Sequence, residues 1–509
     1  MCLNIPWNPS DAWQYLRDIA NGSHDCPEAP SSAQRARIAY LQLSNTTLAD
    51  TVDLEEAYTG LKKYRLVQNG TLDAETVLCL VQLYASRFHS YFPVVPKGNF
   101  DPHTLNEFAS AEKYLFTAVL TISSKSLDNM QHIHESCCEY MRELLSEISF
   151  GADCDIDAVE ALLLLAQWEP PGLLARVGYI GNGEEDRAAW MHVGLALRAA
   201  QFLELERAFV PGESAEPSER GSRQRLTWIG CYMSDRLLST RLGRSFSPGS
   251  PGSTVGSVYH EFSLLQPTNP EEDAQGKIFQ AHLELIQMHS NFHMFRNSDI
   301  CTTDHATMDQ DHLKSVEELL VAMSNWHRIW GILACSIHLK ATLQMAYEYL
   351  RFDVNALAVK SEMRRAKSSD LYIGCHDDQD ISINNATGTR DFPFMHDAID
   401  AAKMYLNILA NYVDPEEHLK FMPLRYYFHG IHVASFLCKV TVKIISGGQV
   451  LTFMMMEEKV AVGELLRRTK LCFERSSSGP YDVGSRYARL LMLLILPQLP
   501  HSTSSQISG

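Results

Sequence analysis

The chain has 509 residues, of which 45% are apolar and 21% are charged, a composition typical of soluble globular proteins rather than of disordered or fibrous ones. At roughly 150 residues per domain, this length predicts about three domains. The 61 acidic and 44 basic residues give a net charge of −17. This charge argues against nucleic-acid binding by the chain as a whole, because that affinity comes chiefly from neutralised phosphates.

Changes in composition divide the chain into five segments. Residues 1–64 are mixed and lack the basic and apolar regions of a secretory signal. Residues 65–367 have helical hydrophobic periodicity almost throughout, so we expect a helical core there. A polar, acid-rich loop is expected over 368–394, helices that pack on the core over 395–496, and a disordered tail over 497–509. The predicted fold is all-α, a large multi-helix domain with irregular polar loops.

The cysteines indicate the compartment. None of the twelve belongs to a C-x-x-C pair, so a zinc finger or a redox motif has no support. Several, such as Cys79, Cys335 and Cys438, lie inside apolar runs, where a reduced thiol behaves as a small hydrophobe. No apolar run reaches the 18 residues of a membrane span. We therefore expect an intracellular protein that makes no membrane contact.

Two blocks in the predicted core carry unusual features. In Leu83–Pro96 an aromatic helix end reaches Phe92 and Pro93, and we expect the helix to end there because proline disfavours helix at the residue before it. Arg187–Glu206 is apolar around nearly its whole circumference, which predicts burial on most sides. Arg198 interrupts this helix and needs a carboxylate or several carbonyls as partners, since removing a partner from a buried ion pair costs about 3–5 kcal/mol. Gly194 is expected to allow a close helix contact.

A third block, Arg223–Ser245, places Asp235 on a largely apolar helical stripe that begins at Trp228. Residues 219–244 hold six arginines against Glu219 and Asp235, a local charge of +4. We predict a structural ion-pair network in this region, formed by Arg198, Arg225, Asp235, Arg236 and Arg244. An anion or partner site is the alternative, and catalysis a more distant one. No catalytic residue and no metal ligand is predicted.

These blocks, in this order, resemble the regulatory region of fungal-specific transcription factors, the family normally headed by a binuclear Zn2Cys6 cluster. Arg187–Gln201 is similar to the family's AWMxxGxAxRxAQ helix, and Arg223–Ser245 to its RRxxWWxxYxxDRxxSxxxGRP helix. The residues that carry these motifs are Trp190, Gly194, Trp228, Ser239 and Gly243. The resemblance covers roughly residues 65–495 and is nearest to the branch that regulates secreted-protease genes.

The chain departs from the family pattern at several points. The closing proline is Ser245, the tandem tryptophan is Thr227–Trp228, and the six cysteines of the zinc cluster are missing. The resemblance therefore implies a nuclear regulator of transcription that reaches DNA only indirectly, or through an N-terminal domain that a late-starting gene model omits. We expect no cofactor in this chain, and zinc only with such an upstream cluster.

The resemblance leaves the partners open. It implies protein partners or a small-molecule effector, and a dimer is possible. The alternatives are a co-regulator that heterodimerises with a full-length relative, or a helical enzyme of secondary metabolism. An enzyme is not the predicted function.

Four weaker patterns are expected to carry no chemistry. They are the histidine–cysteine run at residues 132–138, the histidine face of His282, His289 and His293, the glycines at 178–183 and the acidic run Asp377, Asp378 and Asp380. The basic run at residues 360–367 is a weak nuclear-import signal or a solvated helix end.

Overall fold

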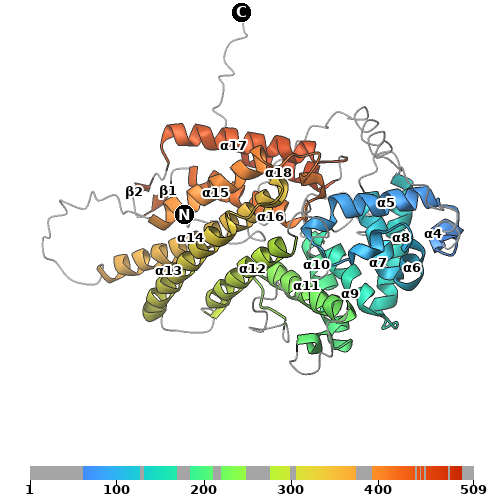
Figure 1. Cartoon of the computed structure of the whole chain (residues 1–509). Coiled ribbons are helices and arrows are strands. Elements are labelled where there is room, and N and C mark those ends of the chain that lie inside the picture. Colours follow the sequence, from blue (N-terminus) through green and yellow to red (C-terminus); the bar gives the residue numbers. More distant parts are fainter. Residues whose placement is uncertain are drawn as a thin grey trace, which may run out of the picture.

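The computed structural model describes residues 61–125, 131–168, 184–209, 219–247, 275–298, 305–373, 393–441, 444–446, 449–451, 454–479 and 482–495. These residues are almost wholly helical, which confirms the all-α prediction (Figure 1). The strands in this part of the chain are a short antiparallel pair, β1 (Ile444–Ser446) and β2 (Gln449–Leu451). None of the described helices has both the length and the apolarity needed to span a bilayer.

The first half of the described chain is built around a buried helix. It comprises α4 (Arg65–Gln68), α5 (Ala74–Arg87), η1 (His89–Tyr91), η2 (Lys97–Phe100), α6 (Leu105–Ala111), α7 (Lys113–Ser124), α8 (Gln131–Ser149), α9 (Ile156–Gln167), α10 (Glu184–Phe202), η4 (Leu205–Phe209) and α11 (Glu219–Leu242). Every residue of α7 from Tyr114 onward is buried, because α5, α8 and α9 pack around it. Helix α5 ends before Phe92 and Pro93, as the sequence predicts.

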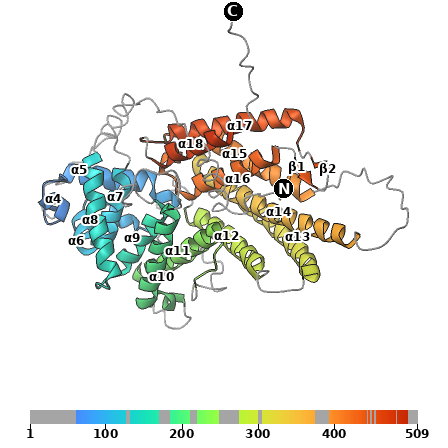
Figure 2. The same ribbon diagram turned by 180° about the vertical axis from the view of Figure 1, so that it is seen from behind.

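The second half is a bundle of longer helices. It comprises α12 (Gln275–Ser298), α13 (His305–Trp330), α14 (Ile337–Ile373), α15 (Pro393–Asn411), η8 (Leu419–Phe421), α16 (Arg425–Thr441), α17 (Met456–Arg475) and α18 (Val483–Ile495). Helix α15 packs along α14 and also contacts α16 and α17. Viewed from either side, α5–α8 lie at one end of the molecule and α13 and α14 extend toward the other, with α11 and α12 between them (Figure 2).

Two segment boundaries can be compared with the predicted ones. Helix α14 continues to Ile373, so the loop predicted from residue 368 begins no earlier than residue 374. Helix α15 begins at Pro393, two residues before the predicted boundary at 395. Residues 1–60 and 496–509, and so most of the predicted N-terminal segment and the predicted tail, lie outside the described residues.

The two halves meet where α9 ends. The Trp168 indole donates a hydrogen bond to the Phe421 carbonyl at 2.9 Å. The backbone carbonyl of Gln167 accepts the Leu424 N–H at 3.0 Å, and the side-chain oxygen of Gln167 accepts a hydrogen bond from Arg425 at 2.8 Å. These bonds satisfy the carbonyl end of α9 and the start of α16 together. One large hydrophobic core runs through both halves, and a smaller separate cluster lies between α11 and α12.

Candidate functional site

Arg223 on α11 is the centre of a partly buried ion-pair cluster. Its guanidinium donates to Glu112 at 2.6 and 2.8 Å and to Glu160 at 3.0 and 2.6 Å. Glu160, on α9, is fully buried and also accepts the Thr227 hydroxyl at 2.7 Å. Glu112 lies between α6 and α7 and accepts from Asn99 at 3.0 Å. We call Glu112, Glu160, Arg223 and Thr227 the Arg223 cluster; it ties the start of α7, α9 and α11 together.

Carboxylates outnumber cations around this cluster. Asp157, one turn before Glu160 on α9, accepts the Tyr114 backbone N–H at 3.2 Å. Burial, with a smaller contribution from the nearby Glu112 and Glu160, raises the pKa of Asp157 to about 7. Burial also raises the pKa of Glu160, although Arg223 and Thr227 favour its ionised form. One guanidinium therefore faces two carboxylates, with a third acid that gains or loses its proton near neutral pH.

A cavity of about 530 Å³ opens beside the Arg223 cluster. It lies between η2, the first residues of α9 and α11, and the turn from α10 to η4. Its lining residues are Pro96, Asn99, Asp155, Ile156, Leu203, Leu205, Glu219, Arg220, Arg223 and Gln224. Apolar side chains and charged groups of both signs thus meet in one concave surface.

Backbone strain accompanies one wall of this cavity. Glu204 has φ of +55°, the one positive value at a non-glycine residue in the described ranges. It separates Leu203 and Leu205, which both line the cavity, and its own carboxylate pairs with Arg207 at 2.8 Å. A non-glycine residue in this conformation costs on the order of 1 kcal/mol and persists only where its surroundings enforce it.

Asp235 is buried, as its apolar stripe predicts, but its bonds go to the chain beyond α11. The carboxylate is 2% exposed and accepts the Ser247 N–H at 3.2 Å and the Ser247 hydroxyl at 2.7 Å. Burial raises the pKa of Asp235, while Ser247 and the charge of Arg236 oppose that rise. The Arg236 guanidinium lies over the Phe246 ring at 3.7 Å. Asp235 therefore holds the segment that follows α11 against that helix.

The other arginines of the predicted network are placed differently. Arg198 is exposed on α10, so the prediction that this guanidinium is buried is wrong. Arg244 is exposed too, and among the described residues its bonds are made by the backbone, which donates to the Ser239 carbonyl and accepts from His293, both at 2.8 Å. Arg225 donates to the Ser222 hydroxyl at 3.3 Å. Arg198 and Arg244 therefore do not join Asp235 in a buried network.

The motif residues are mostly structural. Trp228 and Ser239 are buried, and Trp190 is half-buried against the core. Gly243 ends α11 with φ of +62°, a left-handed helix cap that glycine adopts without strain.

The expected close contact at Gly194 is wrong, because a Cβ there would meet nothing within 4 Å. The close approach occurs instead at Gly230, where a Cβ would lie 3.1 Å from Val94 and 3.2 Å from Leu163.

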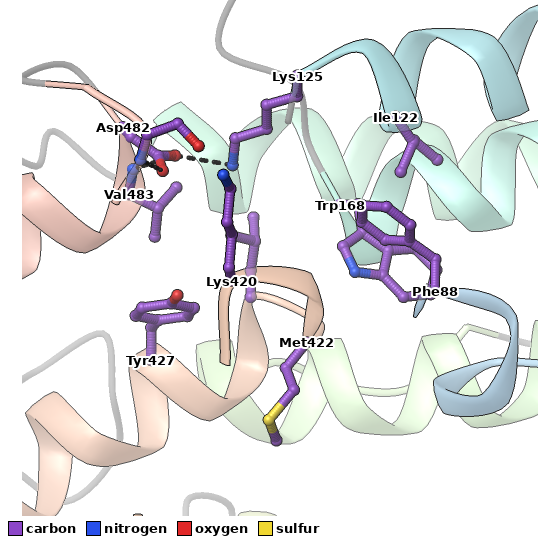
Figure 3. A pocket seen from close by; sticks show the side chains of 11 residues that line it. Phe88, Ile122, Lys125, Trp168, Lys420, Met422, Tyr427, Asp482 and Val483 are labelled. Atoms are coloured by element: carbon purple, nitrogen blue, oxygen red, sulfur yellow. Dashed lines mark hydrogen bonds and ion pairs between the residues drawn. The ribbon is translucent and has the colours of Figure 1, made fainter. Parts of the chain in front are cut away.

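A second cavity lies where the two halves meet, but it is small. Lys125 reaches across to Asp482 at 2.8 Å, with Phe88 and Trp168 on the far side of the space (Figure 3). Asp482 also accepts the backbone N–H groups of Ser478 and Val483 at 3.1 and 2.7 Å. The volume is about 20 Å³, room for a single water. This seam is therefore a closed packing contact between the halves.

The histidine patterns are engaged in hydrogen bonds. His289 bonds Asp353 at 2.9 Å, His282 bonds Thr342 at 3.3 Å, and His134 bonds Ser124 at 3.0 Å. No group of three or more metal-ligating side chains occurs among the residues that the structure describes. The glycines at 178–183 and the acidic run at 377–380 lie outside those residues, and the basic run at 360–367 lies on α14.

Sequence reasoning missed the Arg223 cluster. Asp157 and Glu160 are acids on an otherwise apolar helix, which is the same signal that singled out Asp235. Applied to α9, that signal indicates two buried carboxylates that need partners. The choice of Arg223 as the partner depends on the fold, since Glu112 is 111 residues away along the chain.

Comparison with known proteins gives one match. Residues 81–328 match the family model described as the fungal specific transcription factor domain, just under half of the chain. No curated protein and no solved structure matches the chain at a significant level. The matched span contains all four residues of the Arg223 cluster and the cavity beside it.

Proposed function

Residues 81–328 of this chain are a fungal specific transcription factor domain, and from that premise we propose that the protein regulates transcription in the nucleus through its helical part. In this proposal the helices receive a signal, from a partner protein or a small effector, and carry out no catalysis. The observation that carries the proposal is the family match over the span that holds the Arg223 cluster. A regulatory family, rather than an enzyme family, is what that span matches.

The proposal assigns DNA recognition to other parts of the system. Zinc-cluster readers hold their metal with closely paired cysteines, and the twelve cysteines of this sequence include no C-x-x-C pair. A net charge of −17 opposes phosphate binding by the helical part. DNA is then contacted through a Zn2Cys6 domain joined to this domain or through a partner that carries one.

The mechanism we propose depends on the arrangement of α7, α9 and α11. The Arg223 cluster holds these helices through four guanidinium–carboxylate hydrogen bonds. A signal changes the output only if it binds one arrangement of these helices more tightly than another. The cluster and the adjoining cavity supply a place at which such a preference can act.

A second candidate function assigns the same helical domain to a co-regulator. As a co-regulator, the chain would pair with a full-length relative and alter that relative's activity without reading DNA itself. The net charge of −17, which opposes phosphate binding, favours this candidate. A helical enzyme of secondary metabolism is disfavoured by the family that residues 81–328 match.

A tethering experiment tests the proposal. The 509-residue chain is fused to a bacterial repressor's DNA-binding domain, and a reporter with that repressor's operator is measured. We expect reporter output to change severalfold relative to the DNA-binding domain alone, and Arg198→Gln, at an exposed site, to behave as wild type. An unchanged reporter at equal protein level would refute a regulatory role.

A gel-shift assay at low salt separates the proposal from direct DNA reading. The purified chain without any fusion is expected to give no sequence-specific complex. Specific binding by these residues alone would overturn the assignment of DNA recognition to another domain or chain.

A further inference from the structure

The cavity beside the Arg223 cluster has the size of a ligand site. Its ~530 Å³ falls within the range of about 300–1,000 Å³ typical of small-molecule sites. Ile156, Leu203 and Leu205 provide an apolar wall, and Arg220 and Gln224 lie one helical turn apart on α11. A ligand with an apolar body and one polar end would match this division.

The charges that line the cavity are not equivalent, because most of them are already compensated. Arg223 donates four hydrogen bonds to the two carboxylates of its cluster. Asp155 caps α9 by accepting the Ile156 N–H at 2.8 Å. Glu219 lies in the first turn of α11, where the helix dipole favours a negative charge. None of these three groups needs a ligand to balance it.

Arg220 is the exception. It too lies in the first turn of α11, where the helix dipole disfavours a cation. No side chain in the described ranges forms an ion pair or a hydrogen bond with it. Glu219 precedes it directly, and adjacent residues on a helix do not face each other. The cavity is therefore lined by one exposed guanidinium that no side chain in the described ranges compensates.

The strained turn after α10 contributes two of the apolar lining residues. Glu204, at φ of +55°, lies between Leu203 and Leu205, which both line the cavity. Strain of this kind concentrates at sites where ligands are held, because the surrounding structure must over-determine it. The strained turn is an observation independent of the charge on Arg220.

We infer that the cavity binds a small organic monocarboxylate with an apolar body, its carboxylate on Arg220 and its body against Leu203, Leu205 and Ile156. A planar carboxylate matches the two parallel N–H donors of a guanidinium. A phosphate dianion fits less well, because Asp155 and Glu219 line the same cavity. In the regulatory role, which rests on the proposed function, the ligand joins the first turns of α9 and α11 and stabilises the arrangement that the Arg223 cluster holds.

A matched pair of probes tests this site on the purified full-length chain. The probes are 4-phenylbutyrate and 4-phenylbutan-1-ol, which share the apolar body and differ in the anionic group, and binding is measured by calorimetry. We expect the acid to bind at least about tenfold more tightly than the alcohol, which corresponds to ~1.4 kcal/mol. Arg220→Gln is expected to abolish that difference and to leave alcohol binding unchanged. Arg198→Gln, an exposed arginine outside the cavity, serves as the control.

Three results would overturn the site: no binding of either probe, equal binding of both by wild type, or undiminished selectivity in Arg220→Gln. A second variant, Leu203→Trp, fills the cavity from its apolar wall and is expected to weaken both probes, with helix content checked by circular dichroism. Calorimetry does not measure transcription, so the ligand site and the regulatory function are refuted by different results. Acid selectivity with an inactive tethered reporter refutes only the regulatory function, and an active reporter without selectivity refutes only the site.

Discussion

Removing the Arg223 guanidinium tests whether the cluster stabilises the domain. In Arg223→Met the side chain keeps its apolar stem, while four charge-assisted hydrogen bonds are lost. Glu160 remains fully buried with only the Thr227 hydroxyl as a donor, and Glu112 remains beside it. Leaving a buried charge without its partner costs about 3–5 kcal/mol. We expect the free energy of unfolding at pH 8 to fall by that amount.

The pH dependence of this loss identifies its cause. Without Arg223, the two carboxylates repel each other and Glu160 binds a proton more readily in the folded state. A proton bound by the folded variant stabilises it at lower pH. The loss at pH 5 is therefore expected to be smaller than the loss at pH 8.

Urea denaturation followed by tryptophan fluorescence and circular dichroism measures both quantities. Arg207→Met is the matched control, since Arg207 is 61% exposed and pairs only with an exposed glutamate on the surface. Its expected effect is within about 0.5 kcal/mol. The reasoning fails if Arg223→Met loses no more stability than Arg207→Met, or if its loss is the same at both pH values.

Three further predictions follow from single contacts. Burial raises the pKa of Asp157 to about 7, so the proton that stabilises the folded state is present at pH 4 and is lost as the pH rises through 7. In urea denaturation, wild type should therefore lose stability relative to Asp157→Asn over that pH range. Parallel stability curves of the two proteins would contradict this prediction. Gly194→Ala should raise thermal stability by roughly 0.5–1 kcal/mol, since its Cβ meets nothing. Gly230→Val should lower it by about 1–3 kcal/mol by overpacking; equal effects would refute the helix contact. Asp235→Ala should accelerate hydrogen exchange of the Ser247 amide, which loses its acceptor, and unchanged exchange would show that the carboxylate does not hold this segment.

The fold class could be predicted because helical periodicity is local. The aromatic end of α5 before Phe92 and Pro93 was predictable for the same reason, since proline acts on its immediate neighbour. The exposure of Arg198 was not predictable in this way, because α10 also leaves Met191 57% and Phe202 85% exposed. Apolar residues around the whole circumference of this helix therefore do not indicate burial on all sides.

The site was less predictable than the fold. The rule that a charge among apolar neighbours is buried succeeds at Asp235 and would have succeeded at Glu160. The sequence does not indicate which arginine pairs with Glu160, because Arg223 and Arg225 are residues of the same type on the same helix. Only the packing of α9 and the start of α7 against α11 distinguishes the two. Two lining residues of the cavity flank the turn at Glu204, and the positive φ of this turn cannot be predicted from the sequence because glutamate does not favour that conformation.

The most direct test of the regulatory role is a comparison of transcript levels in three strains of the producing cell: one with the wild-type chain, one without it, and one with Arg223→Met at equal protein level. The account predicts that removal of the chain changes a defined set of transcripts and that Arg223→Met changes the same set in the same direction. Transcripts that are unaltered when the chain is removed would contradict the account.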